Sequence, residues 1–204
     1  MEKQSELQTG STIIPLANLA NRHGRLIADV ITGQKVSAHG SLGTAIVGAF
    51  GMMAAITGLS EKAAKRAGIS HRVIHLHPGS HAGYYPGAKR VSLKLIFDAA
   101  DGSILGAQGT GEDGVDKRID VIATAIAGGI KVDELMDLEL AYAPQFGSAK
   151  DAINMAGYVG NNVLSGRPQP CSGTSYSRRR LPGQPWLTFA PMPSTRPEPY
   201  PEAC

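Results

Sequence analysis

The first regular pattern of hydrophobic positions along the chain has the period of an α-helix. Apolar side chains recur three or four positions apart at Leu16, Leu19, Ala20, Ile27, Val30 and Ile31. Pro15 suits the first turn of such a helix, and Gly33 suits its C-terminal cap. The pattern therefore predicts a helix over about residues 15–32. Residues 1–12 are polar, unlike a signal peptide, and we expect them to be extended or disordered.

A different period follows in the middle of the chain, where apolar and polar positions alternate as in strands. Residues 90–98 show this most clearly, and residues 71–77 show it too. Asp101 and Gly102 form a hairpin signal that joins residues 90–98 to a further strand at 104–108. Residues 44–58 are small, β-branched and interrupted by glycine, which we interpret as buried strands. The acidic, glycine-rich run 106–114 we interpret as a turn and not as a phosphate-binding loop.

Helical patterns separate and follow these strands. Ser60 can cap a short helix over residues 61–67. Asp113 can cap a longer helix, whose apolar face consists of Val115, Ile119, Ile122 and Ile126. A short helix is expected near residues 133–138, and Ser148 with Asp151 resembles a capping box at the start of a last helix that ends at Gly166. Helices on an antiparallel hairpin predict an α+β fold, an antiparallel sheet packed with helices.

The distribution of charge separates a body from a tail. Residues 1–166 hold 15 basic and 15 acidic side chains, so the net charge of +3 comes from residues 167–204. A neutral body argues against nucleic-acid binding, and the longest apolar run, residues 44–59, is too short to cross a membrane as a helix. The body contains no cysteine, which fits the reducing cytoplasm. Nine of the thirteen prolines lie after residue 166, so we expect a disordered C-terminal tail.

Three tyrosines in loops are the first candidates for chemistry. Tyr84 and Tyr85 precede Pro-Gly, and Tyr142 lies in Leu-Ala-Tyr-Ala-Pro. A phenol can donate to a carbonyl or a thiolate, and its ring can cover a flavin, but most tyrosines only pack. Both readings stay open on spacing alone. The histidines at positions 71, 75, 77 and 81 suggest a metal site, but no Cys, Asp or Glu lies between residues 70 and 90 to complete one, and we assign no metal.

Three motifs together resemble one protein family. They are Pro-Leu-Ala-Asn-Leu-Ala-Asn-Arg at 15–22, Ser-His-Ala-Gly-Tyr-Tyr-Pro-Gly at 80–87 and Leu-Ala-Tyr-Ala-Pro-Gln-Phe-Gly-Ser-Ala-Lys-Asp at 140–151. Residues 13–166 are similar to the C-terminal part of FAD-dependent pyridine nucleotide-disulfide oxidoreductases, in the CoA-disulfide reductase and NADH oxidase branch. The resemblance implies a remnant of the FAD-binding domain at 1–34, a dimerisation domain at 35–166 and a tail outside the family at 167–204.

The resemblance also implies roles for particular residues. Tyr84, in preference to Tyr85, and Tyr142 would act in the active site of the partner subunit, Tyr142 also next to the cofactor. Leu16 and Ala17 would approach the flavin ring with backbone amides. Lys150, expected in the first turn of the last helix, and Arg22 would contact coenzyme A.

The function implied by the resemblance is that of a dimerisation domain of an FAD- and NAD(P)H-dependent reductase that forms a homodimer or joins a full-length subunit. CoA disulfide would be its substrate, with oxygen or peroxide as alternatives. The cofactors would belong to the parent enzyme, and we expect this chain alone to bind none tightly and to be inactive. Two alternatives stay open: a free-standing adaptor that dimerises with a reductase without catalysis, and a metal-binding protein that uses the histidines.

Overall fold

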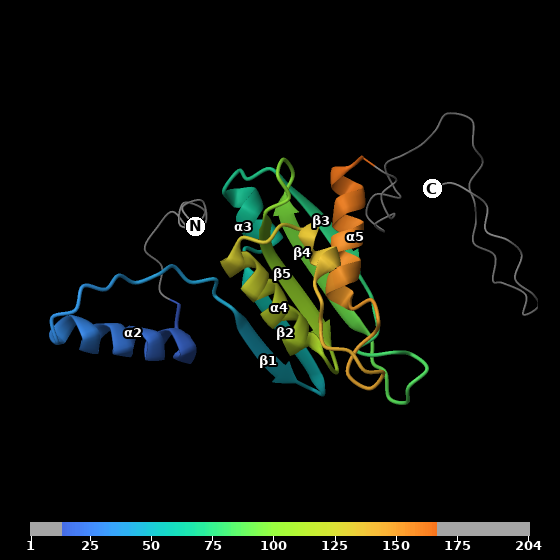
Figure 1. Ribbon diagram of the computed structural model, residues 1–204, viewed down its shortest axis with the longest axis horizontal. Helices are drawn as coiled ribbons and strands as arrows, with labels where there is room; N and C mark the ends of the chain where they lie inside the picture. The colour runs from blue at the N-terminus through green and yellow to red at the C-terminus, as the bar shows by residue number, and fades with distance from the viewer. Residues whose placement is uncertain (1–13, 167–204) are drawn as a thin grey trace, which may run out of the picture.

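The alternating stretches of the sequence form one antiparallel sheet. The computed structural model describes residues 14–166, and its strands are β1 (Ala45–Ala49), β2 (Met52–Gly58), β3 (His71–Leu76), β4 (Val91–Asp98) and β5 (Ile104–Gly111). They lie in the order β1-β2-β5-β4-β3, and every neighbouring pair is antiparallel (Figure 1). The predicted hairpin is confirmed: β4 and β5 pair, and Gly102 lies in their connection with φ 74°.

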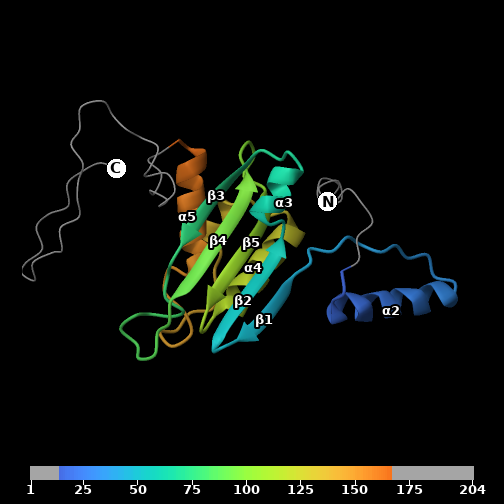
Figure 2. The same ribbon diagram turned by 180° about the vertical axis from the view of Figure 1, so that it is seen from behind.

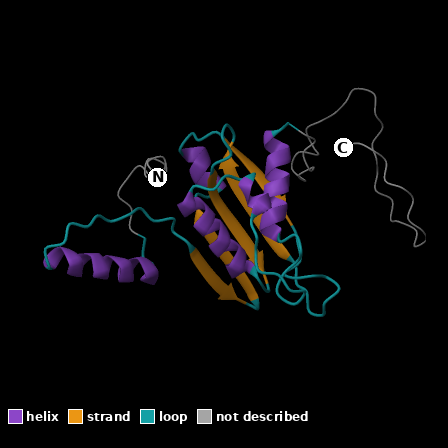
Figure 3. Cartoon of the chain, viewed as in Figure 1, coloured by secondary structure: helices purple, strands orange, loops and turns teal. Residues whose placement is uncertain are grey.

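Helices form a second layer on one face of this sheet. α4 (Val115–Gly128) crosses β5 and β2, whereas α5 (Ala152–Leu164) lies over β3 with the 3₁₀ helix η1 (Glu134–Asp137) beside it (Figure 3). The short helix α3 (Glu61–Arg66), capped by Ser60 as predicted, lies at one end of the opposite face, where Glu61 pairs with Lys94 of β4 (Figure 2). The α+β fold is confirmed.

The core lies between the sheet and α4. Alternate residues of β4 (Val91, Leu93, Leu95 and Phe97) are buried. They meet the apolar face of α4, in which Ile119 and Ile122 are buried. The two-residue period of residues 90–98 therefore marks the face of the sheet that enters the core. The period of three to four residues after Val115 marks the face of α4 that covers it.

The glycine-rich run is mostly strand, so its interpretation as a turn is wrong for residues 106–111. At Gly109 a Cβ would lie 2.9 Å from Val115 Cγ1, and at Gly111 it would lie 2.9 Å from the Arg90 carbonyl oxygen. The glycines thus allow α4 and β4 to approach β5 closely. Gly109, Gly111 and Gly114 also have the G-x-G-x-x-G spacing of dinucleotide-binding turns. Here, however, β5 has only antiparallel neighbours, unlike the strand of a parallel βαβ unit.

Three predicted helix starts are shifted by one to three residues. Pro15 lies before the first turn of α2 (Ala17–Ile31), which has Leu16 as its N-cap. α4 begins after Gly114, whose φ of 72° lets the chain turn into the helix, and not after Asp113. The capping box of α5 consists of Asp151 and Asn154, and not of Ser148 and Asp151. Each shift reflects a turn that local composition does not specify.

Residues 44–58 form strands as predicted, but much of their apolar surface is exposed. Ile46, Val47 and Met52 are exposed, and Phe50 at the tip of the β1–β2 hairpin is fully exposed with φ 53°. The prediction of buried strands is wrong for this chain by itself, because β1 is an edge strand and α4 reaches only as far as β2.

The predicted first helix is confirmed as a helix, and it does not pack on the sheet. α2 has no buried residue and lies apart from the sheet in both views (Figures 1 and 2). Among residues 14–166, none of the helices is at once long and apolar enough to span a bilayer. The predictions for residues 1–12 and for the tail at 167–204 lie outside the described residues, and the boundaries of the three-part division stay a prediction.

Candidate functional site

Two loops bring the candidate tyrosines together. Tyr84 lies in the loop between β3 and β4, and Tyr142 lies in the loop between η1 and α5. Their hydroxyl oxygens are 3.0 Å apart, a hydrogen bond between residues 58 positions apart in sequence. Tyr85 has a different surrounding, since its ring packs edge-on against His81 at 5.8 Å between centroids. The geometry thus pairs Tyr142 with Tyr84 and not with Tyr85.

The tyrosine pair, Tyr84 with Tyr142, is accessible and carries a spare donor. Tyr84 is 77% exposed and Tyr142 is 49% exposed. One hydroxyl donates to the other, so one O–H remains free to donate to a third group. The hydrogen bond with Tyr84 raises the pKa of Tyr142 above its ordinary value. The Tyr142 phenol is therefore neutral at neutral pH, and the free O–H of the pair suits an anionic or partly negative acceptor.

A buried arginine connects the two loops beneath the tyrosine pair. Arg118 of α4 is 1% exposed, and its Nη2 donates to the carbonyl oxygen of Ser80 at 2.7 Å, in the loop of Tyr84. Its Nε and Nη2 also donate to the two carboxylate oxygens of Asp151, at 3.2 and 2.7 Å, at the end of the loop of Tyr142. Nη1 donates to the Gly114 carbonyl at 3.0 Å. Four of the five guanidinium N–H groups are thus used.

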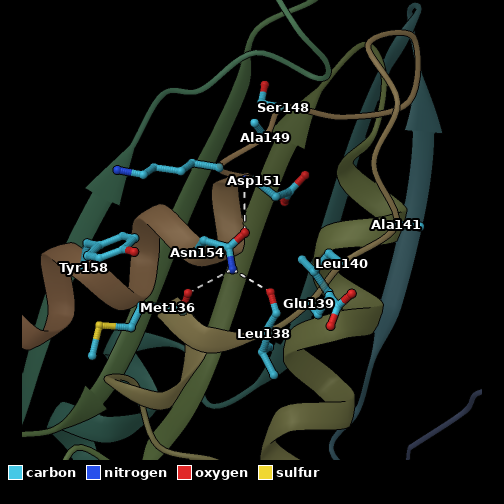
Figure 4. Close-up of a pocket in the computed structure, with 11 residues that line it drawn as sticks. Met136, Leu138, Glu139, Leu140, Ala141, Ser148, Ala149, Asp151, Asn154 and Tyr158 are labelled. Carbon is cyan, nitrogen blue, oxygen red and sulfur yellow. Dashed lines mark hydrogen bonds between the residues drawn. The ribbon is translucent and has the colours of Figure 1, made fainter.

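The Asp151 carboxylate also caps the N-terminus of α5, so it connects Arg118 to that helix. It accepts from the backbone N–H of Ile153 at 3.2 Å, and the Asn154 side chain accepts from the N–H of Asp151 at 3.1 Å. The Asn154 amide nitrogen donates to the carbonyl oxygen of Leu135 at 3.2 Å. It also donates to the carbonyl oxygens of Met136 and Leu138, at 3.3 and 2.9 Å (Figure 4). These bonds fix both ends of the segment that carries Tyr142.

A pocket of about 280 Å³ lies beside this segment, between residues 136–141 and the start of α5. Lys150 and Tyr158 line it. Glu139 lies across the pocket from Tyr158 (Figure 4). Lys150 precedes the N-cap of α5, so its predicted place in the first turn is wrong. Its Nζ lies 5.0 Å from the centroid of the Tyr158 ring, a cation–π contact that leaves the ammonium free to bind an anion.

The structure does not bring the predicted cofactor and CoA residues of α2 to the tyrosine pair. Leu16, Ala17 and Arg22 belong to the separate first helix. Leu16 provides no side-chain cap, and the first turn contains no acidic residue. The N–H groups of Leu16 and Leu19 are already bonded, to the Ile14 carbonyl oxygen at 2.8 Å and to Asn18 Oδ1 at 2.7 Å. The Ala17 amide is left open to an acceptor. Among residues 14–166, no three His, Cys, Asp or Glu side chains are grouped to hold a metal ion.

Comparison with known proteins identifies the family to which the chain belongs. Residues 44–153, more than half of the chain, match the model for the dimerisation domain of pyridine nucleotide-disulphide oxidoreductases. The chain belongs to this family and contains its dimerisation domain.

Two relatives show which members of the family this chain resembles. Coenzyme A disulfide reductases of Staphylococcus haemolyticus and Staphylococcus aureus are 40% and 38% identical over 151 and 146 residues, which are 74% and 71% of this chain. These matches cover 34% and 33% of the two relatives, so the chain spans about a third of their length. The dimerisation domain is thus similar to that of CoA disulfide reductases.

Solved structures agree with this assignment. The reduced Bacillus anthracis CoADR-RHD is 51% identical with a TM-score of 0.75 over 78% of this chain and 29% of that one. An NAD-dependent persulfide reductase from A. fulgidus is 37% identical with a TM-score of 0.76 over 79% of this chain and 30% of that one. A water-forming NADH oxidase from Lactobacillus brevis, 20% identical over 78% of this chain and 36% of that one with a TM-score of 0.74, shares the fold.

Sequence reasoning missed Arg118 and Asn154 as parts of the site. The signal for Arg118 was present, because it lies three residues after Val115 on the apolar face of its helix, where a charge requires a buried partner. For Asn154 there was no comparable signal, since its acceptors lie 16 to 19 positions away in the chain.

Proposed function

We propose that this chain supplies the dimerisation domain of an FAD- and NAD(P)H-dependent reductase of CoA disulfide, with Tyr84 and Tyr142 acting in the active site of the partner subunit. The 3.0 Å hydrogen bond between the two hydroxyls is the observation that carries the proposal. Two exposed phenols that converge from distant loops, with no buried surroundings to explain them, suit a ligand that approaches from outside the chain.

The chemistry proposed for the tyrosine pair concerns the leaving thiolate. A cysteine thiolate of the reductase would attack one sulfur of CoA disulfide, the S–S bond would break, and the departing CoA sulfur would take the electron pair. The free O–H of the tyrosine pair would donate a hydrogen bond to that sulfur as its negative charge develops. A neutral donor that needs no reorganisation stabilises such a charge more effectively than water does.

Lys150 would bind a phosphate of coenzyme A at the pocket beside α5. Its ammonium is held by the Tyr158 ring at 5.0 Å, and no acidic side chain forms an ion pair with it in the described part of the chain. Arg22, exposed on α2, would make a second contact to the same substrate once α2 joins the complete enzyme.

The residues at the start of α2 fit one edge of a flavin. The Leu16 N–H donates to the Ile14 carbonyl oxygen at 2.8 Å, so the Ala17 N–H is the amide that can donate to a flavin carbonyl oxygen. The positive end of the helix dipole favours the electron-rich edge of the flavin. When bound, FAD would carry electrons from NAD(P)H to the disulfide; this chain would contribute only this amide to its binding.

Self-association is the most direct test of the dimerisation role. Exposed apolar side chains on the β1–β2 hairpin (Ile46, Val47, Phe50 and Met52) and the exposed α2 suit surfaces that another polypeptide covers. We expect the chain to sediment as a dimer at tens of micromolar. A well-folded monomer at that concentration would contradict the homodimer.

A chimera tests the tyrosines in a complete enzyme. Residues 44–166 of this chain would replace the corresponding domain of the Staphylococcus haemolyticus reductase, and turnover of CoA disulfide would be measured. Tyr84→Phe and Tyr142→Phe should each lower kcat on the order of tenfold, as expected for a hydrogen bond to a charged group. Tyr85→Phe is the matched control and should leave kcat unchanged.

Two outcomes would decide against the proposal. If Tyr84→Phe and Tyr142→Phe turn over CoA disulfide as fast as the unaltered chimera, the tyrosine pair is structural. If Tyr85→Phe is the slow variant, the role belongs to the neighbouring tyrosine and the paired geometry is irrelevant to catalysis.

A further inference from the structure

Arg118 is the largest fully buried side chain in the described part of the protein, yet it carries a charge. Its bonds do not serve the apolar core. They end on the Ser80 carbonyl, four residues before Tyr84, and on the Asp151 carboxylate, nine residues after Tyr142. One guanidinium therefore contacts both tyrosine-bearing loops at once.

We propose that Arg118 is a positioning residue, which holds the loop of Tyr84 against the loop of Tyr142 so that both hydroxyls face the same substrate atom. The catalytic part of this inference rests on the proposed function. The effect of Arg118 on the two tyrosine rings can be tested in this chain alone, so the positioning role and the proposed function can fail separately.

The bonds between the loops explain why a remote side chain sets the tyrosine geometry. The N–H of Ala82 donates to the carbonyl oxygens of Gly147 at 2.9 Å and Pro144 at 3.2 Å, which joins the loops directly. Arg118 fixes the chain on both sides of this junction, at Ser80 and at Asp151. The rings themselves are exposed, and an exposed hydroxyl pair contributes too little to order two loops.

Arginine is the residue type that this position requires. A side-on pair of bonds to Asp151 and two further bonds to carbonyls in different segments need a planar group with several fixed donors. A lysine ammonium at the same depth could reach only part of this set. If Arg118 served only to fill the core, uncharged side chains of similar volume at positions 118 and 151 would leave the two loops in place.

The experiment uses the full chain and a neutral replacement of the ion pair. Arg118→Met combined with Asp151→Asn removes both charges, and Asn keeps the N-cap of α5. Because neutral replacements of buried ion pairs often preserve stability, this double variant should fold and melt within a few degrees of the unaltered chain. Arg118→Lys is the second variant and retains the charge.

The measurement is contact between the two tyrosine rings. In the unaltered chain with labelled tyrosine, we expect a nuclear Overhauser effect between Tyr84 and Tyr142 at neutral pH. In the double variant this effect should be lost, and the pKa of Tyr142 should fall to its value in Tyr84→Phe. Arg118→Lys should give a weakened effect. Lys89→Gln, which removes an exposed ion pair with Glu112 from the same loop, is the control and should change neither readout.

A double variant that folds and keeps both the ring contact and the raised pKa of Tyr142 would overturn the proposal. Loss of the whole fold in both Arg118 variants would also overturn it, because Arg118 would then support the domain and not the loops. If instead the ring contact depends on Arg118 but the chimera turns over equally well with Phe at 84 and 142, only the proposed function fails.

Discussion

Gly157→Ala should destabilise the domain by forcing α5 away from η1. A Cβ at Gly157 would overlap the backbone nitrogen of Met136 and would lie 2.8 Å from the Leu135 carbonyl carbon and 2.9 Å from Met136 Cα. Carbon atoms pack best at about 3.5–4.0 Å, so the helix must shift by roughly 1 Å. Backbone atoms cannot rotate away, and overpacking of this kind costs about 1–3 kcal/mol.

Urea denaturation measures this cost. At a slope of about 2 kcal/mol per molar urea, a loss of about 2 kcal/mol moves the midpoint down by about 1 M. Gly128→Ala, at the last residue of α4, is the matched control, because its Cβ would lie 3.8 Å from Ile130 Cγ1, an ordinary van der Waals contact. It should raise stability by about 0.5 kcal/mol through lower chain entropy. Equal midpoints for Gly157→Ala and the unaltered chain would refute the close approach of α5 to η1.

Three further predictions concern other parts of the chain. Hydrogen bonds from Lys65 and Lys94 lower the pKa of Glu61 to about 2, so Glu61→Gln should cost about 1 kcal/mol at pH 7 for this partly exposed group. In thermal melts the difference should shrink as the pH falls below about 4.5 and be lost below about 2; a difference that is as large at pH 2 as at pH 7 would contradict this. Phe50→Asn should stabilise the monomeric chain by about 0.5–1 kcal/mol in melts at concentrations too low for self-association, because asparagine tolerates the positive φ of this turn. No gain would mean that the Phe50 ring stabilises the turn. Lys150→Ala in the chimera should raise KM for CoA disulfide more than it lowers kcat, since a phosphate contact far from the sulfur is mostly uniform binding, whereas a fall in kcat alone would exclude that role.

The strands and the core of this fold could be predicted because side-chain period reports them directly. The alternation in residues 90–98 became β4, and the apolar face of residues 115–126 became the inner face of α4. The hairpin signal at Asp101 and Gly102 worked for the same reason, since a turn depends on local backbone preferences. These features are local, and the structure only assembles them.

Burial and close packing between segments could not be predicted in the same way. Residues 44–58 have the composition of buried strands, but their exposure depends on which element covers the edge of the sheet. Likewise the glycines at 106–111 look like a turn until α4 and β4 are placed against them. In both cases the deciding neighbour lies in a distant part of the chain, so composition leaves the outcome open.

The candidate site combines both situations. The motifs identified Tyr84 and Tyr142 individually, but only the structure shows that their hydroxyls meet, and only it connects them to Arg118. A charged residue within an apolar helical face must either leave the core or find buried partners, because an unpaired buried charge is costly. Arg118 finds them in the two loops that carry the tyrosines. The exception to the hydrophobic pattern of α4 is therefore the residue through which the core of the domain is connected to its candidate site.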